Sequence, residues 1–348
     1  MELGKFLLMA SLIPLVSSCY LTRLALTHNN LYNSRRPLAE VEKDPKTNAK
    51  TKDALLFVEE IQNYSKQHGL IPDSSYRHFI EHPGPISYLL EVAHPDRLEL
   101  LTFWYPIIGD MPYQGFFSHK DRDEEADRFK DEGFDIEKGQ VAAFSALGWF
   151  ADPIYSSMLD RSKPALCELF FHEITHQTVW FADQGPFNEN LASFVSSHLT
   201  KSFLQEKGLK KELLAYLALE KDQQIYQKWL SELKAALNHL YSQSTLTKQV
   251  LLTQKATLFK TFLTDKKPRF NRYDLIDDKS WNNATVIGAS LYVVDFSPFQ
   301  RAFTCSEREK IGDFIQDLIL KRDYEKKDPY LILKTFCPED ANDTRKPT

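Results

Sequence analysis

The chain has 348 residues, of which 43% are apolar and 26% are charged, an ordinary globular composition with enough apolar material for a sizeable core. A net charge of −5, without a basic stripe interleaved with aromatic residues, argues against binding to nucleic acid. The four cysteines (Cys19, Cys167, Cys305 and Cys337) are too few for a disulfide scaffold, and Cys305 with Cys337 is the one pair that we consider.

Residues 1–18 read as a signal peptide. The apolar run from Phe6 to Val16 is shorter than the roughly 20 residues of a membrane-spanning helix. The residues before Cys19 resemble a bacterial lipobox, so we expect Cys19 to become a lipidated N-terminus that anchors the protein to a membrane. The alternatives are a plain secretory signal or an ordinary N-terminal anchor. Because Tyr20 and not Asp follows Cys19, we expect a cell-envelope lipoprotein on the outer membrane, facing the periplasm.

Residues 19–48 are expected to form the lipidated N-terminus and a linking helix, since their weak apolar stripe favours a docked helix over a free tether. A catalytic domain is predicted over 49–345, with a sheet-containing half at about 49–160 and a helical half at about 161–345. It begins with an amphipathic helix over 53–68, which Gly69 ends.

The composition then becomes typical of strands. Residues 86–94 and 98–108 predict a hairpin, 121–133 a charged surface helix, and 140–147 a further strand. As the last predicted strand before the motif described next, the segment 141–148 is a candidate to pair with an extended substrate backbone, through Ser145, Ala146, Leu147 and Gly148. An ordinary core strand is an equally good interpretation.

Residues 170–193 carry the strongest chemical signal. His172 and His176 are four residues apart in an H-E-x-x-H motif, so a helix places both imidazoles on one face, beside Glu173. Gly185-Pro186 is expected to break this helix, and Asn188 to cap a second helix that brings Glu189 to the same metal ion. Two histidines and one glutamate leave a fourth position open, as catalytic zinc requires. The alternative is a surface helix with two solvated histidines.

The remainder reads as helical. Long periodic helices are predicted over 210–240 and 246–263, a shorter helix over 279–294, and an amphipathic helix over 306–320 that begins with a capping box at Ser306 and Glu309.

Several segments, in the same order along the chain, carry a family resemblance. They include Tyr105 to Phe117, Leu147 to Phe150, the motif FFHEITHQ, FNEN, and Asn282-Asn283-Ala284 leading to Tyr292. The chain resembles a bacterial family described as putative zinc aminopeptidases, often lipoproteins, with the arrangement of a gluzincin metallopeptidase. It departs from that pattern at Thr27-His28 and at Asn190-Leu191. Neither departure involves a metal ligand, so they bear on substrate preference more than on the catalytic chemistry.

The resemblance implies an α+β, zincin-like fold with a small N-terminal mixed or antiparallel sheet, an active-site helix and a largely helical C-terminal half. It implies one zinc ion on His172, His176 and Glu189, with Glu173 as general base and Tyr292 as a donor to the oxyanion. Ser193, four residues after Glu189, and Asn188 are expected to support the ligands from behind. Manganese or cobalt would suit the same ligands.

The expected activity is hydrolysis of a peptide or protein substrate, with the aminopeptidase assignment resting on the resemblance. An aminopeptidase needs an anion to bind the substrate amine, and Asp110, Glu168 and Asp152 are candidates. The alternatives are an endopeptidase with the same metal site and a non-catalytic cell-envelope lipoprotein.

Overall fold

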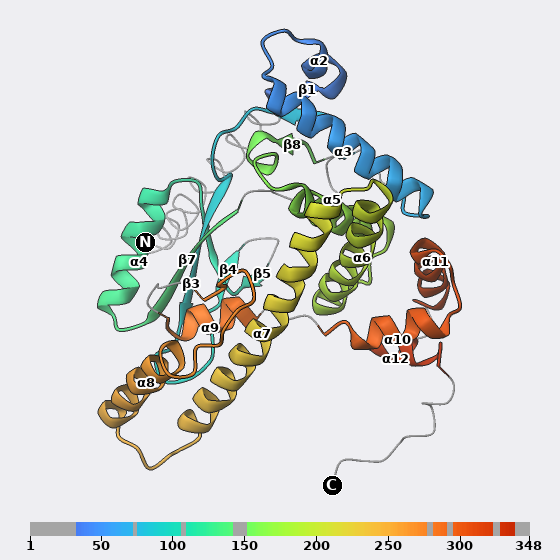
Figure 1. The fold of residues 1–348 in the computed structure, drawn as a ribbon. Helices are drawn as coiled ribbons and strands as arrows, with labels where there is room; N and C mark the ends of the chain where they lie inside the picture. The colour runs from blue at the N-terminus through green and yellow to red at the C-terminus, as the bar shows by residue number, and fades with distance from the viewer. Residues whose placement is uncertain are drawn as a thin grey trace, which may run out of the picture.

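The computed structural model describes residues 33–71, 75–105, 109–141, 152–276, 281–290, 295–322 and 328–337. The expectations for Cys19, for residues 145–148 and for Tyr292 lie outside these ranges. The described part is a mixed α+β structure in which helices predominate (Figure 1).

Within the described ranges the strands form three small sheets. The first sheet has the order β1-β2-β8 and is mixed, whereas the β6-β3-β7 and β4-β5 sheets are antiparallel. The strands are β1 (Arg36–Pro37), β2 (His78–Ile80), β3 (Ser87–Ala93), β4 (Phe103–Tyr105), β5 (Gly109–Met111), β6 (Gln114–Phe116), β7 (Asp135–Val141) and β8 (Ile154–Tyr155).

The β6-β3-β7 sheet has a helix on each face (Figure 1). Leu90 and Val92 of β3 pack on Ala126 and Phe129 of α4 (His119–Asp131). Successive side chains of a strand point to opposite faces, so the residues between them point to the other face, against α9 (Asn283–Ser290).

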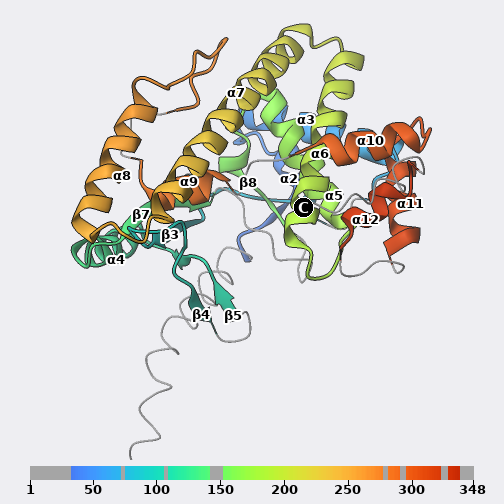
Figure 2. The ribbon, with the colours of Figure 1, turned by 90° about the horizontal axis from the view of Figure 1, so that it is seen from below.

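The predicted hairpin over 86–108 is confirmed only next to its turn, where the N–H of His94 donates to the Glu99 carbonyl and the N–H of Leu101 to the Val92 carbonyl. Apart from this short contact, β3 pairs with β6 and β7. Residues 103–105 pair instead with 109–111, in a small sheet that projects from the body (Figure 2). Alternating apolar residues predict a strand but not its partner. Here β3 pairs with β7, whose residues lie more than 40 positions later in the sequence.

The strand predicted over 140–147 begins earlier than expected. β7 occupies 135–141, and residues 142–150 lie outside the described part of the chain. It is also not the last strand before the H-E-x-x-H helix, because β8 follows it and pairs in parallel with β2.

Three helices form the centre of the molecule: α3 (Ala49–Gln67), α5 (Lys163–Thr178) and α6 (Gly185–Glu206). Their largest side chains meet in one aromatic cluster, in which Tyr64, Phe171 and Phe203 have ring centroids 5.0–6.0 Å apart. The same core includes Val41 of α2 (Leu38–Lys43), so the described end of the predicted N-terminal link is docked on the body.

The predicted helical hairpin is confirmed in α7 (Lys210–Tyr241) and α8 (Lys248–Leu263), which share a second core with Trp281 near the start of α9. The hairpin is joined to the sheet by a buried ion pair between Lys255 of α8 and Asp135 of β7. Asp135 also accepts a hydrogen bond from the backbone N–H of Asn283, at 2.8 Å. The Asn-Asn-Ala segment therefore joins helices to sheet.

The C-terminal helices form a separate layer against α6 (Figure 1): α10 (Ser297–Cys305), α11 (Ile311–Lys321) and α12 (Tyr330–Lys334). Cys305 and Cys337 form a disulfide with a Cα–Cα distance of 5.5 Å, which ties the end of α10 to the residues after α12. The predicted capping box is wrong, because Ser306 ends α10 and α11 begins only at Ile311. None of the described helices combines the length and apolarity needed to cross a bilayer.

Candidate metal centre

The H-E-x-x-H motif lies in the last two turns of α5. The helix buries Phe170, Phe171 and Ile174 in the main core and leaves His172 and His176 on its partly exposed side. The helix ends at Thr178, because Val179 is extended and Asp183 adopts a positive φ of 59° in the connection to α6.

The connection brings the second helix back onto the first, although not as predicted. Gly185-Pro186 begins α6 instead of ending α5, which agrees with the preference of proline for the first turn of a helix. Asn188 is therefore inside the helix and is not its cap. Its buried side chain accepts a hydrogen bond from the Phe181 N–H at 2.9 Å and donates one to the Phe181 carbonyl at 2.7 Å.

This clamp places Glu189 opposite the two histidines. The Nε2 atoms of His172 and His176 are 3.0 Å apart, and each lies 3.3 Å from a different oxygen of Glu189. One ligand atom from each residue can be chosen so that all lie within 4.8 Å of one another. Ligands of tetrahedral zinc, each about 2.05 Å from the ion, are roughly 3.3 Å apart, so the donor set and spacing fit a zinc ion.

The electrostatics of this cluster favour an anionic ligand. Hydrogen bonds from His172 and His176 hold the pKa of Glu189 far below its ordinary value, although partial burial opposes this. Burial raises the pKa of Glu173, while the two histidines act in the opposite direction. Among the described residues, none donates a hydrogen bond to the Glu173 carboxylate, so its oxygens are available to a water molecule or a substrate.

Support from Ser193 is not found. In the described part of the chain, no hydrogen bond joins Ser193 to either histidine. Glu168, one turn before His172, interacts electrostatically with His172 and accepts a hydrogen bond from Tyr216 of α7 at 2.6 Å. Burial raises the pKa of Glu168. The i, i+4 spacing of Glu168 and His172 is visible in the sequence; the contact with Tyr216 is not.

The three candidates for binding a substrate amine are not part of the cluster. Glu168 is engaged by Tyr216, Asp110 lies opposite Trp104 in the projecting β4-β5 sheet, and Asp152 packs beside Ser75. None of them is among the residues that could share an ion with Glu189.

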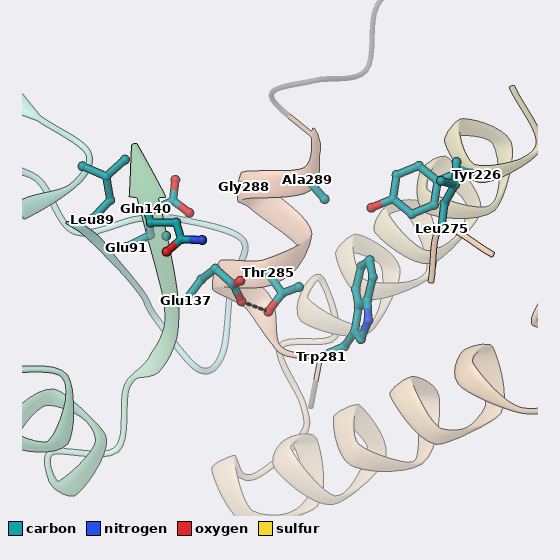
Figure 3. Close-up of a pocket in the computed structure, with 11 residues that line it drawn as sticks. Leu89, Glu91, Glu137, Gln140, Tyr226, Leu275, Trp281, Thr285, Gly288 and Ala289 are labelled. Carbon is teal, nitrogen blue, oxygen red and sulfur yellow. Dashed lines mark hydrogen bonds between the residues drawn. The ribbon is translucent and has the colours of Figure 1, made fainter. Parts of the chain in front are cut away.

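A separate hollow of about 320 Å³ lies between the β6-β3-β7 sheet and α9 (Figure 3). Glu91 and Glu137 are paired across the strands, and Thr285 donates a hydrogen bond to Glu137 at 2.7 Å. A Cβ atom on Gly288 would lie 2.6 Å from a Glu91 carboxylate oxygen, so a larger residue at this position would displace the Glu91 side chain. The hollow contains none of the three candidate metal ligands.

Two histidines and a glutamate that could hold one metal ion thus lie together, beside a carboxylate that accepts no hydrogen bond from the described residues. A comparison with protein families matches residues 19–327 to the family described as "Putative aminopeptidase", and the chain belongs to this family. Membership indicates a peptidase, and the matched range includes both helices of the cluster. Comparisons with curated proteins and with solved structures found no match.

Proposed function

We propose that the chain is a zinc-dependent aminopeptidase of the gluzincin type. The observation that carries this proposal is the convergence of His172, His176 and Glu189, with Glu173 beside them and without a hydrogen-bond partner among the described residues. Family membership supplies the peptidase assignment, and the geometry supports the metal dependence.

A zinc ion on these three residues would polarise the scissile carbonyl and lower the pKa of a water molecule. Glu173 accepts the proton of that water and later delivers it to the departing amine. Its partial burial suits this role, because a raised pKa brings a carboxylate closer to the pH at which it must exchange protons. We also propose that residues 145–148 pair with the extended substrate backbone, as a strand added at a sheet edge would.

We also propose export, lipidation at Cys19 and attachment to the outer membrane on its periplasmic side. The Cys305–Cys337 disulfide supports an oxidising compartment, because structural disulfides are rare in proteins that stay in the reducing cytosol. Mass spectrometry of the mature N-terminus would test lipidation, and an unmodified Met1 would contradict it.

The first test is the metal content of the full chain, purified in detergent. We expect about one zinc per chain in the wild type and in Glu173→Gln, and none in His176→Ala. His198→Ala is the matched control, because His198 lies on α6 and packs on Phe303 outside the cluster. A well-folded wild type without stoichiometric metal would contradict the proposal and favour a non-catalytic envelope lipoprotein.

The second test compares one peptide with a free and with an acetylated N-terminus. An aminopeptidase cleaves only the free peptide, since it recognises the terminal ammonium group. Equal cleavage of both would indicate an endopeptidase with the same metal site.

A further inference from the structure

Glu189 is the most exposed residue of the candidate metal centre. Its side chain is 58% exposed, and the partners found for it among the described residues are the two histidines. A carboxylate without other contacts takes its position from the backbone that carries it. The first two turns of α6, which carry Glu189, must therefore be held by the neighbours of this residue.

One neighbour is held from the α5 side. Asn188 is clamped to Phe181 by two hydrogen bonds, which fixes the start of α6 relative to the histidine helix. This contact is local, since it joins residues seven apart.

The other neighbour is held from the opposite end of the sequence. Asn190 donates a hydrogen bond from Nδ2 to the hydroxyl of Tyr330, at 2.7 Å and across 140 residues. The ring of Tyr330 also packs edge-on against Phe187, with centroids 5.0 Å apart, and lies 5.8 Å from Phe299 of α10. Tyr330 thus contacts both the residue after Glu189 and a residue before it.

Tyr330 can act as an anchor because its own helix is fixed. A five-residue helix such as α12 has little stability of its own. Its buried residues Ile332 and Leu333 belong to the main core, and the disulfide at Cys337 ties its end to α10.

We propose that Tyr330 is a positioning residue for the third metal ligand, acting through Asn190 on the second turn of α6. This inference rests on the proposed metal site, and it adds that the C-terminal helices help to position one of the metal ligands. Groups that hydrogen-bond a metal ligand directly are worth about 10- to 100-fold in metal affinity, and because Tyr330 acts through the residue after the ligand, we expect the lower end of this range, about tenfold. Tyr330→Phe removes the hydroxyl and keeps the ring, so it isolates the hydrogen bond.

The chain offers a matched control on the same helix. Tyr64 donates a hydrogen bond to Glu206 at 2.7 Å, at the other end of α6 and about 25 Å from Glu189 at about 1.5 Å per residue. Tyr64→Phe therefore removes a tyrosine–α6 hydrogen bond that does not reach the metal ligands.

The experiment measures the zinc affinity of the full chain by chelator competition, and the visible absorption of its cobalt form. We expect about tenfold weaker zinc binding and an altered cobalt spectrum in Tyr330→Phe, and wild-type values in Tyr64→Phe. Asn190→Ala should weaken binding to a similar degree, and the double variant should bind no more weakly than Tyr330→Phe alone. Asn190→Ala also provides the test if Tyr330→Phe does not fold.

Wild-type zinc affinity in both Tyr330→Phe and Asn190→Ala would overturn the inference and leave the metal site standing. Equal weakening in Tyr64→Phe would overturn it too, because the effect would then be general destabilisation of α6. A wild type that binds no metal would overturn the proposed function and this inference together.

Discussion

At the scale of single residues, the candidate metal centre is held by one local contact, between Asn188 and Phe181, and one distant contact, between Asn190 and Tyr330. The H-E-x-x-H spacing could be predicted from the sequence because it depends only on helix geometry. Glu189 could be predicted because its helix follows directly. The role of Asn188 could not, since the same Gly-Pro pair that suggests a helix break is equally suited to begin a helix.

Glu173→Gln tests the general base directly. The amide cannot accept a proton, so kcat should fall by about 10²- to 10⁴-fold while metal content stays the same. Steady-state kinetics on a cleaved peptide measures this. Glu60→Gln is the control, because Glu60 forms a surface ion pair with Lys207 and should leave kcat unchanged. An unaltered kcat in Glu173→Gln would assign the base to another group.

Asn188→Ala should destabilise the fold. It leaves the buried N–H and carbonyl of Phe181 without partners, at a cost of about 1–3 kcal/mol each. Urea denaturation should therefore show a loss of about 2–6 kcal/mol. Asn188→Asp keeps the acceptor and should lose less, and a neutral Asn188→Ala would mean that water replaces the clamp.

At the scale of elements, the sequence predicts helices better than strand partners. The positions of α3, α4, α7 and α8 agree with their apolar periodicity to within a few residues, because a helix satisfies its own backbone hydrogen bonds. The strand pairing fails because β3 finds its partners beyond intervening elements. The contacts of Asn282 and Asn283 with strand and loop carbonyls are non-local as well.

The loop after α8 depends on a buried carboxylate in α7. Asp222 accepts hydrogen bonds from the backbone N–H groups of Asn271, Arg272 and Tyr273 and from the Asn271 side chain. Burial raises the pKa of Asp222, but these four bonds outweigh it and lower the pKa from 3.8 to about 2. The stabilisation is therefore complete above pH 4 or so and is lost as the pH falls through about 2.

Asp222→Asn should accordingly lower the melting temperature at pH 7, and the difference from the wild type should shrink on going from about pH 5 to pH 2. Thermal melting over this pH range measures it. Asp160→Asn is the control, because Asp160 pairs with Lys50 at the exposed surface, where ion pairs contribute little. A difference that does not depend on pH would contradict the role of the charge.

The ion pair between Lys255 of α8 and Asp135 of β7 should contribute to stability. Lys255→Met leaves Asp135 as a buried carboxylate without its cation, since the two side chains are only 9% and 16% exposed. Loss of one partner of a buried pair costs about 3–5 kcal/mol, measurable by urea denaturation. The double variant Lys255→Met/Asp135→Asn should lose less than the sum of the two single variants. Strict additivity would mean that the pair is not coupled.

At the scale of the whole molecule, one hydrophobic core extends from Val41 to Leu333 and includes α3, α5, α6 and the C-terminal layer. The α7–α8 hairpin and α9 have their own core beside the sheet. The helices of the candidate metal centre lie in the larger core, so their relative position depends on packing contributed by both ends of the described chain.

The Cys305–Cys337 disulfide should stabilise this assembly. Closing a loop with a sequence separation of 32 lowers the entropy of the unfolded chain and so raises the free energy of unfolding by about 3–4 kcal/mol. Urea denaturation with and without a reducing agent measures this difference. Cys167→Ala should respond to reductant as the wild type does, because Cys167 is a buried thiol whose pKa is raised by burial. A wild type insensitive to full reduction would contradict the prediction.

The same disulfide has a consequence for the timing of activity. Because it ties the residues after α12 to α10, a chain in which it is reduced would hold Tyr330 less firmly, and the proposed metal site would then bind its ion more weakly. The proposed site would then reach its full metal affinity only after the disulfide has formed. The proposed peptidase would then be less active towards other proteins in the reducing compartment where it is synthesised.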